Sequence, residues 1–265
     1  MGTESFPIVW EKACATIEIA QGRAIADASV AAGVTFLLWS TLPNVTKMTG
    51  GKLSGVQHFD SKASVETYIR GLPIKSAFYM PAFYMQNFNV IFKPKPVSHP
   101  PRSHIAQLTG QQLIALDQNA NGELEFAQTW SPDTRIPLID ITDTGKFLAP
   151  VLLDPERYIG KIMTAATAYY TGPEMAGIWT DVTGRKVAFV QIPGGTTMGN
   201  LSPEMVRTLK ESSGLMKDYS YYGTSGPKNL EWTLEQMEEK PTTWEEFVRA
   251  NQPWFDDIKA GYRPE

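Results

Sequence analysis

Two short apolar runs separated by one helical segment constrain the fold of this chain more than any other feature. The first run, Val34–Trp39, follows a long segment, Trp10–Ala32, in which small apolar residues recur every three or four positions. A predicted helix over residues 60–70, capped by its first residues, then leads to the second run, Ile74–Met80. Because a helix between two buried strands is typical of a βαβ unit, the sequence predicts a parallel sheet flanked by helices.

Composition and charge exclude several classes of function. The chain has 265 residues, 42% of them apolar, which is enough for one large core with a small appended domain. A net charge of -4 argues against direct nucleic-acid binding, since that requires a clustered excess of Lys and Arg. The single cysteine, Cys14, fits a reducing compartment. No apolar stretch reaches the roughly 18 residues that a membrane span needs. We therefore expect a cytoplasmic protein without a membrane anchor, and a nuclear location stays open.

Three blocks of sequence carry the strongest functional signal: Trp39–Asn44, His58–Lys62 and Phe78–Asn87. They resemble blocks in the NmrA-like family, an atypical branch of the short-chain dehydrogenase/reductase superfamily with a Rossmann-type NAD(P)-binding fold. The resemblance runs from Trp10 onward, apart from residues 93–122. It implies that the chain binds NADP(H) and acts either as a cofactor-sensing regulator or as an oxidoreductase.

His58 and Lys62 are the candidate catalytic residues. Typical short-chain dehydrogenases place a tyrosine four residues before a lysine, whose ammonium lowers the pKa of the phenol. Here the spacing is kept and His58 takes the place of the tyrosine; an imidazole can relay a proton, but it ordinarily titrates near pH 6.5. The resemblance implies that Lys62 reaches the ribose and nicotinamide end of NADP(H). The alternatives are a polar loop residue for His58 and a solvated helix lysine for Lys62.

Four further residues are candidates for cofactor binding: Tyr84, Met85, Gln86 and Asn87. They follow a predicted strand that ends at Pro81, and open α/β sheets bind their ligands at this carboxyl edge. In the family the corresponding loop lies along the nicotinamide and its ribose. The alternative is that the aromatic and apolar residues here pack the core, an explanation that fits Asn87 least.

One expected motif is absent from the sequence. A dinucleotide needs its pyrophosphate at a helix N-terminus behind a glycine-rich turn, and no strand here is followed by such a turn. Gly194–Gly195 lacks the required spacing. The resemblance therefore implies that the N-terminal nucleotide-binding half is missing and that cofactor binding is impaired. We also expect an exposed sheet edge and an exposed alanine-rich face on the first helix.

Residues 93–122 look like an irregular insert without a family counterpart. Prolines at positions 94, 96, 100 and 101 interrupt regular structure there. The segment also holds His99 and His104, two of the three histidines, and three histidines with one cysteine are too few for a convincing metal site. No metal is therefore expected.

The C-terminal part is predicted to be mixed and increasingly helical. Thr171–Glu174 and Thr243–Glu246 are capping-box patterns that begin helices, and Tyr169–Tyr170 resembles a turn of the family only in part. We expect a partial Rossmann-like domain over residues 1–151 and a smaller substrate-side subdomain over residues 152–265.

Three functions stay open at this level. The first is an NAD(P)(H)-binding regulatory, redox-sensing or oxidoreductase-like protein. The second is an NADPH-dependent reductase of a small carbonyl or enone compound, in which a Tyr or His would act with Lys62. The third is a cofactor-free module that pairs with another protein through an exposed sheet edge. By resemblance the partner of a regulator would be a transcription factor, although no residue identifies such a surface.

Overall fold

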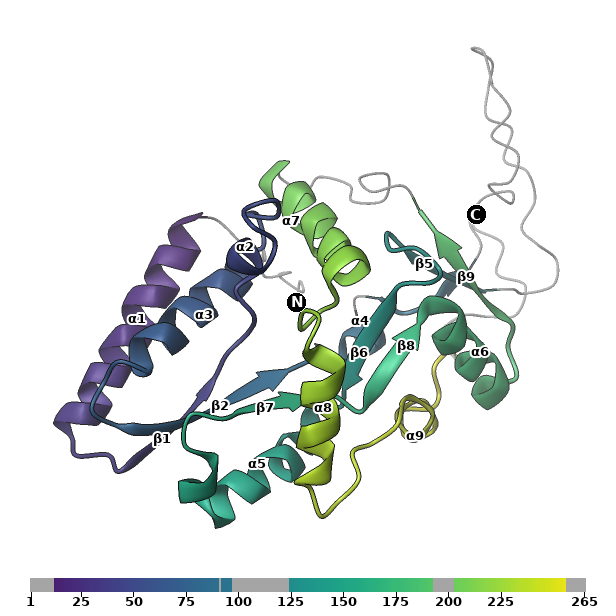
Figure 1. The fold of residues 1–265 in the computed structure, drawn as a ribbon. Coiled ribbons are helices and arrows are strands. Elements are labelled where there is room, and N and C mark those ends of the chain that lie inside the picture. Colours follow the sequence, from purple (N-terminus) through teal and green to yellow (C-terminus); the bar gives the residue numbers. More distant parts are fainter. Residues whose placement is uncertain (1–11, 91, 97–123, 193–202, 256–265) are drawn as a thin grey trace, which may run out of the picture.

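Three small sheets and the helices around them make up the described part of the chain (Figure 1). The structure is a computed structural model that describes residues 12–90, 92–96, 124–192 and 203–255. The first sheet is wholly parallel and consists, in spatial order, of β1 (Phe36–Ser40), β2 (Lys75–Pro81) and β7 (Ile162–Ala165). The predicted α/β class, a parallel sheet flanked by helices, is confirmed.

The other two sheets lie further along the same molecule and mix strand directions. One consists of β3 (Phe83–Tyr84), parallel to β6 (Arg135–Ile139), which is antiparallel to β8 (Ala168–Thr171). The other consists of β4 (Lys95–Pro96), antiparallel to β5 (Leu124–Gln128), which is parallel to β9 (Val187–Gln191).

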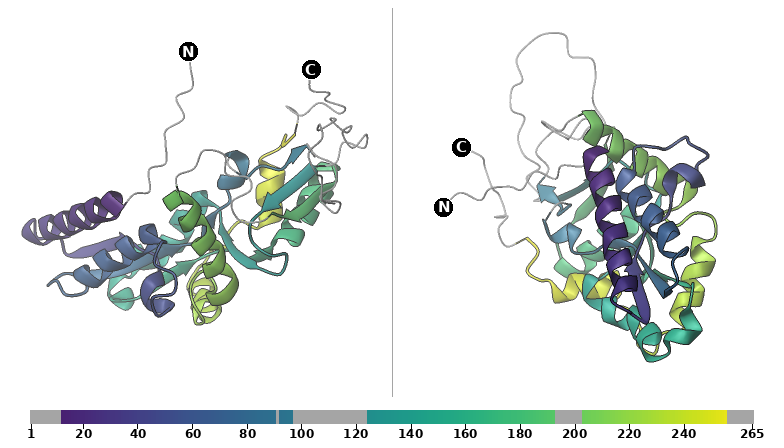
Figure 2. Two further views of the ribbon diagram at one scale, coloured as in Figure 1. Left: turned by 90° about the horizontal axis from the view of Figure 1, so that it is seen from above. Right: turned by 90° about the vertical axis from the view of Figure 1, so that its left-hand side faces the viewer.

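Helices cover both faces of the first sheet. On one face α1 (Lys12–Ala31) and α3 (Gln57–Ile69) lie side by side, and on the other lie α5 (Thr144–Leu153) and α8 (Gly226–Glu235) (Figure 1 and Figure 2). The longer remaining helices are α6 (Gly172–Thr183), α7 (Pro203–Gly214) and α9 (Trp244–Ala250). The short segments are α2 (Val45–Met48), α4 (Asn87–Val90), the 3-10 turns η2 (Ile141–Asp143) and η3 (Pro155–Tyr158), and the π-helical η4 (Leu215–Tyr219). No helix among the described residues has the length and apolar character needed to cross a membrane.

Most local predictions are confirmed. The predicted helix over residues 10–32 is α1, and the two apolar runs are β1 and β2. Both capping boxes form, with Thr171 and Thr243 each accepting a hydrogen bond from the backbone of the glutamate three residues later. These signals depend on neighbours within one or two turns, so they can be recognised without the tertiary structure.

Two local predictions are wrong. Tyr169–Tyr170 lies within β8 and forms no turn, because the chain returns antiparallel to β6 directly after β7. Pro96 belongs to the two-residue strand β4 despite lacking an N–H; β4 is the outer strand of its sheet, where a missing donor is tolerated. The rest of the predicted insert, residues 97–122, lies outside the described residues, and so do Gly194–Gly195.

The strands of the three sheets come from both sides of the expected boundary at residue 151. Strand β7 follows this boundary and pairs with β2, whereas β5 and β6 precede it and pair with β9 and β8. The division into two domains stays a prediction.

Helix α1 packs with a different face from the one its alanine stripe suggests. Ile19, Gly22 and Ala26 face α3, and Ala26 is fully buried. The stripe formed by Ala20, Ala24, Ala28 and Ala31 is exposed. Strand β1 is only half-buried and pairs with β2 alone among the described strands. Among the described residues, the outer edge of β1 is therefore unpaired and the alanine-rich helix face is exposed, as expected.

Replacing Gly22 with alanine is expected to destabilise the protein by about 1 kcal/mol. An added Cβ would lie 2.7 and 2.9 Å from the two methyl groups of Val65 and 3.3 Å from the ring of Trp39. Overpacking of this kind costs about 1 to 3 kcal/mol, which exceeds the gain of about 1 kcal/mol in helix propensity. Urea denaturation of Gly22→Ala measures the net effect. Gly177→Ala in α6 is the matched control, because an added Cβ there meets no atom within 4 Å and only the propensity gain applies. Equal stabilisation by both changes would contradict the close packing of α1 on α3.

Candidate functional site

The start of α3 places His58 and Lys62 in its first two turns. The helix begins at Gln57, one turn before the predicted cap at Asp60 or Ser61, and Val56 at its N-cap makes no side-chain capping bond. The predicted cap is wrong because the carboxylate of Asp60 is used elsewhere: it accepts hydrogen bonds from the backbone N–H and the hydroxyl of Thr46, at 3.1 and 2.5 Å.

The position of α3 brings both candidates to the carboxyl side of the first sheet. Strand β1 ends at Ser40, and the chain then enters α3 before returning to the start of β2. Residues at the start of α3 therefore lie toward the carboxyl ends of the strands, where open parallel sheets bind ligands. His58 and Lys62, four residues apart, share one face of the helix.

Lys62 is held by a carboxylate that sequence reasoning missed. Its Nζ lies 2.5 Å from Oε1 of Glu18 on α1, and it also donates to the backbone oxygen of His58 at 3.3 Å. The other oxygen of Glu18 accepts a hydrogen bond from the Ser61 hydroxyl at 2.5 Å. Ser61 is buried, so the predicted capping residue instead fixes Glu18. The only available sequence signal is a carboxylate in the middle of an alanine-rich helix.

His58 is neutral at physiological pH. Burial, together with the nearby charge of Lys62, lowers its pKa from 6.5 to about 4, and this net shift includes the opposing effects of the Glu18 and Asp60 carboxylates. Its ring meets the ring of Phe59 edge to face, with centroids 4.9 Å apart. A group with this pKa has no imidazolium proton to give near pH 7.

The segment Tyr84–Asn87 lies at the same edge, but two of its four side chains have structural roles. Met85 is fully buried in the core between the second and third sheets. Gln86 donates to Oδ1 of Asp140 at 2.6 Å and accepts from the backbone N–H of Ile141 at 3.1 Å, so its amide holds the turn after β6. The core-packing alternative explains Met85, and local hydrogen bonding explains Gln86.

The side chains of Tyr84 and Asn87 have neither the full burial of Met85 nor the hydrogen bonds of Gln86. Both side chains are half-buried. Tyr84 lies in β3 and pairs with Ile139 of β6, and burial raises the pKa of the Tyr84 phenol. Asn87 begins α4 and accepts a backbone hydrogen bond from Phe92 at 3.0 Å.

Two buried tyrosines from the C-terminal part connect the candidate residues. The ring of Tyr221 lies edge to face against Phe59, the neighbour of His58, with centroids 5.2 Å apart, and its hydroxyl donates to the backbone oxygen of Pro81 at 3.4 Å. Tyr222 donates to the backbone oxygens of Met80 and Ala165, at 3.3 and 3.0 Å. The start of α3 and the carboxyl ends of β2 and β7 thus all contact Tyr221 or Tyr222, which are more than 130 positions from α3 and β2 and 57 positions from Ala165 of β7. Both tyrosines are buried in the core around the first sheet.

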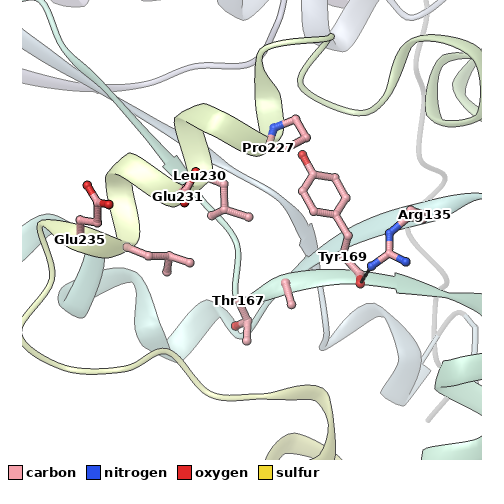
Figure 3. A pocket seen from close by; sticks show the side chains of 9 residues that line it. Arg135, Thr167, Tyr169, Pro227, Leu230, Glu231 and Glu235 are labelled. Carbon is pink, nitrogen blue, oxygen red and sulfur yellow. Dashed lines mark hydrogen bonds between the residues drawn. The ribbon is translucent and has the colours of Figure 1, made fainter.

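A shallow hollow elsewhere on the molecule contains none of the predicted site residues. It has a volume of about 580 Å³ and lies between α8 and the start of β8 (Figure 3). Helix α8 covers the face of the first sheet away from α1 and α3 (Figure 1). Its polar lining includes Arg135, which donates to the backbone oxygen of Tyr169 at 2.9 Å, and two glutamates of α8, Glu231 and Glu235. The hollow is therefore no part of the candidate site.

The described residues contain no group of three His, Cys, Asp or Glu side chains placed to hold a metal ion. His99 and His104 lie outside the described residues.

The fold and the site define a Rossmann-type α/β protein, and comparison with known proteins gives the family. The model of the NmrA-like family matches residues 8–248, so the chain belongs to the NmrA-like family.

Curated relatives and a solved structure agree with this assignment. The chain is 28% identical over 193 residues to the NmrA-like family domain-containing oxidoreductase FrzB of a Cladobotryum species, covering 68% of this chain and 52% of the relative. It is 26% identical over 192 residues to the NmrA-like family domain-containing oxidoreductase ptmS of Penicillium ochrochloron, covering 69% and 51%. The chain thus spans about half the length of these relatives. It shares its fold with NmrA, a negative transcriptional regulator solved in complex with NADP, with a TM-score of 0.69 at 19% identity over 89% of this chain and 70% of that one.

Proposed function

We propose that this chain is an NAD(P)(H)-binding regulatory, redox-sensing or oxidoreductase-like protein, and that it holds the nicotinamide and ribose side of NADP(H) weakly. The observation that carries the proposal is the placement of Lys62. Its ammonium is fixed near the carboxyl edge of a parallel sheet, with Tyr84 and Asn87 following β2 at the same edge. Lys62 would donate to the ribose hydroxyls, and Tyr84 and Asn87 would contact the nicotinamide end. When bound, NADP(H) supplies hydride chemistry.

Weak binding is proposed because the residues of this chain offer the pyrophosphate no cradle. A pyrophosphate is ordinarily held by backbone N–H groups at a helix N-terminus behind a glycine-rich turn. The sequence has no such turn after a strand. The free energy of binding would therefore come from the nicotinamide side alone.

The charge state of the site favours a sensing role over catalysis. Reduction of a carbonyl needs a proton donor, and His58 with a pKa of about 4 is already deprotonated near pH 7. Burial raises the pKa of Tyr79 to about 12, and no lysine among the described residues lowers it. A cofactor-responsive regulator needs no proton donor. A regulatory protein partner, such as a transcription factor, and a cytoplasmic or nuclear location belong to the same proposal.

The alternative is an NADPH-dependent reductase of a small carbonyl or enone compound. The matched relatives FrzB and ptmS are named as oxidoreductases, which favours this alternative. NADPH consumption across a panel of carbonyl and enone compounds separates the two: turnover that falls in His58→Gln would support the reductase. A cofactor-free interaction module is the third candidate, favoured by the exposed edge of β1.

Replacing Lys62 with alanine is expected to weaken binding of both NADPH and reduced nicotinamide mononucleotide by about 1.5 to 3 kcal/mol, the range for hydrogen bonds to charged groups. Reduced nicotinamide mononucleotide lacks the adenosine half and the pyrophosphate, so the unaltered chain should bind it about as well as it binds NADPH. We expect dissociation constants of about 1 mM or weaker for both. Ligand-observed NMR titration measures such affinities.

Lys75→Ala is the control for this experiment. Lys75 begins β2 at the opposite edge of the sheet and is likewise ion-paired, to Glu156 at 2.6 Å. Its removal should leave nucleotide binding unchanged. Submillimolar affinity for NADPH would contradict the weak-binding proposal, and an unchanged affinity in Lys62→Ala would remove Lys62 from the site.

A further inference from the structure

Glu18 is a charged residue beside the apolar part of the contact between α1 and α3. The surrounding contact is formed by residues such as Ala26, Val65 and Ile69, all buried. Glu18 reaches across it with both carboxylate oxygens engaged, one by the Lys62 ammonium and one by the Ser61 hydroxyl, each at 2.5 Å. A carboxylate held at both oxygens by adjacent residues of one helix has a single orientation.

The ammonium of Lys62 keeps one donor for a ligand. An ammonium carries three N–H donors. Glu18 takes one and the backbone oxygen of His58 takes a second, and no described residue takes the third. The Lys62 side chain is 30% exposed, so the third donor is accessible from solvent.

We propose that Glu18 is a positioning residue, which holds the Lys62 ammonium so that its remaining donor is directed at a ribose hydroxyl of the nicotinamide nucleotide. This inference rests on the proposed function. A lysine side chain is flexible, and near a helix N-terminus its charge is opposed by the helix dipole. Without Glu18 the ammonium would leave this position for solvent. With Glu18 the Lys62 side chain is already ordered in the free protein, so ligand binding does not have to supply the free energy of ordering it.

A purely stabilising role explains the cluster less well. Partly exposed ion pairs contribute little to folding stability, and the chain has a more exposed pair of the same type between Lys75 and Glu156, with side chains 53% and 64% exposed. That pair has no buried hydroxyl on its carboxylate among the described residues. The Lys75–Glu156 pair therefore serves as a matched control.

Two ligands, one anionic and one neutral, distinguish a positioning role of Glu18 from an effect of its negative charge on binding. Reduced nicotinamide mononucleotide carries a phosphate, and reduced nicotinamide riboside is neutral, yet both present the same ribose and nicotinamide. If Glu18 positions Lys62, Glu18→Ala should weaken binding of both probes roughly tenfold, and Glu18→Gln, whose amide oxygen can still accept from Lys62, about threefold. If Glu18 acts only through its charge, its removal should tighten binding of the anionic probe and leave the neutral probe unaffected. The latter result overturns the proposal.

A double-mutant cycle makes the test specific to Lys62. In the Lys62→Ala background, Glu18→Ala should cost no further affinity for the riboside, because the group it positions is gone. An additional loss in that background overturns the proposal, as does an equal loss in the control Glu156→Gln. Glu18→Gln preserves the shape of the side chain, so it reports on binding even where Glu18→Ala impairs folding.

The outcomes also distinguish this inference from the proposed function. If the unaltered chain binds the probes and the Glu18 variants bind them equally well, only the positioning role fails. If the unaltered chain binds neither probe nor NADPH, the proposed function fails and the role of Glu18 fails with it.

Discussion

Replacing Trp179 with alanine is expected to lower the free energy of unfolding by about 3 to 5 kcal/mol, the range for removing a fully buried aromatic side chain. Trp179 lies on α6 and is fully buried. Its ring makes edge-to-face contacts at centroid distances of 4.9 to 5.9 Å with four other aromatic rings, those of Trp244, Phe126, Trp254 and Phe88. These rings come from α4, β5 and the C-terminal stretch that contains α9, so the cavity cannot close by moving one of these elements. Urea denaturation followed by circular dichroism measures the loss.

Trp179→Phe is the control for this prediction. The indole N–H of Trp179 is buried without a hydrogen-bond partner among the described residues, so phenylalanine removes an unsatisfied donor as well as some volume. The loss should therefore be clearly smaller than for alanine. A loss below about 1 kcal/mol in Trp179→Ala would contradict the packing of this aromatic cluster.

The same experiment tests whether the first sheet unfolds separately from the other two sheets. Trp179 and its four neighbours belong to the core around the second and third sheets, whereas Lys62 lies beside the first sheet. Two separate transitions, of which Trp179→Ala shifts only one, would support two cores that unfold independently, neither of which follows the predicted boundary at residue 151. A single shifted transition would indicate that all three sheets unfold as one unit.

The sequence predicts the order of helices and strands well because its signals are local. Small-residue periodicity marks α1, and short apolar runs mark β1 and β2. The periodicity identifies a helix but not the face that packs: the alanine stripe is exposed, and the close contact with α3 is made around Gly22. A missing Cβ gives no hydrophobic signal, so this contact could not be predicted.

The candidate site was only partly predictable, because its side chains are fixed by distant residues. The sequence places His58, Lys62 and the segment after β2 at one sheet edge. It gives no indication that Lys62 pairs with Glu18, which is 44 positions away, or that Gln86 is held by Asp140, 54 positions away. The predicted start of α3 is wrong for the same reason, since Asp60 bonds to Thr46 and is therefore not available as a cap.

His58 is expected to make the protein about 3 kcal/mol less stable at low pH than at neutral pH. Burial, assisted by the charge of Lys62, lowers its pKa from an ordinary 6.5 to about 4 in the folded state. Between these two values the unfolded chain binds a proton that the folded chain does not, so stability falls as the pH decreases from 6.5 to 4. Each pKa unit corresponds to about 1.4 kcal/mol, which gives the size of the loss.

A His58→Gln variant isolates this contribution from that of the carboxylates. Glutamine is polar and of similar length but does not titrate, so the variant should lose less stability than the unaltered chain between about pH 7 and about pH 4.5. Denaturant unfolding at both pH values gives the difference. Identical pH profiles for the two proteins would show that His58 is not buried in its neutral form.

The pKa itself can be measured by NMR, because the chain has only three histidines and single replacements assign their ring signals. The same measurement also shows how the neighbouring charges of Lys62 and Glu18 change the pKa of His58. Removing the Lys62 charge in Lys62→Ala should raise the pKa of His58, since that ammonium disfavours a second positive charge. Glu18→Gln should lower it, because the carboxylate of Glu18 favours the imidazolium. Opposite shifts in the two variants would place all three side chains in one electrostatic cluster, whereas a His58 that titrates near 6.5 in every variant would remove the case against a proton-donating role and favour the reductase.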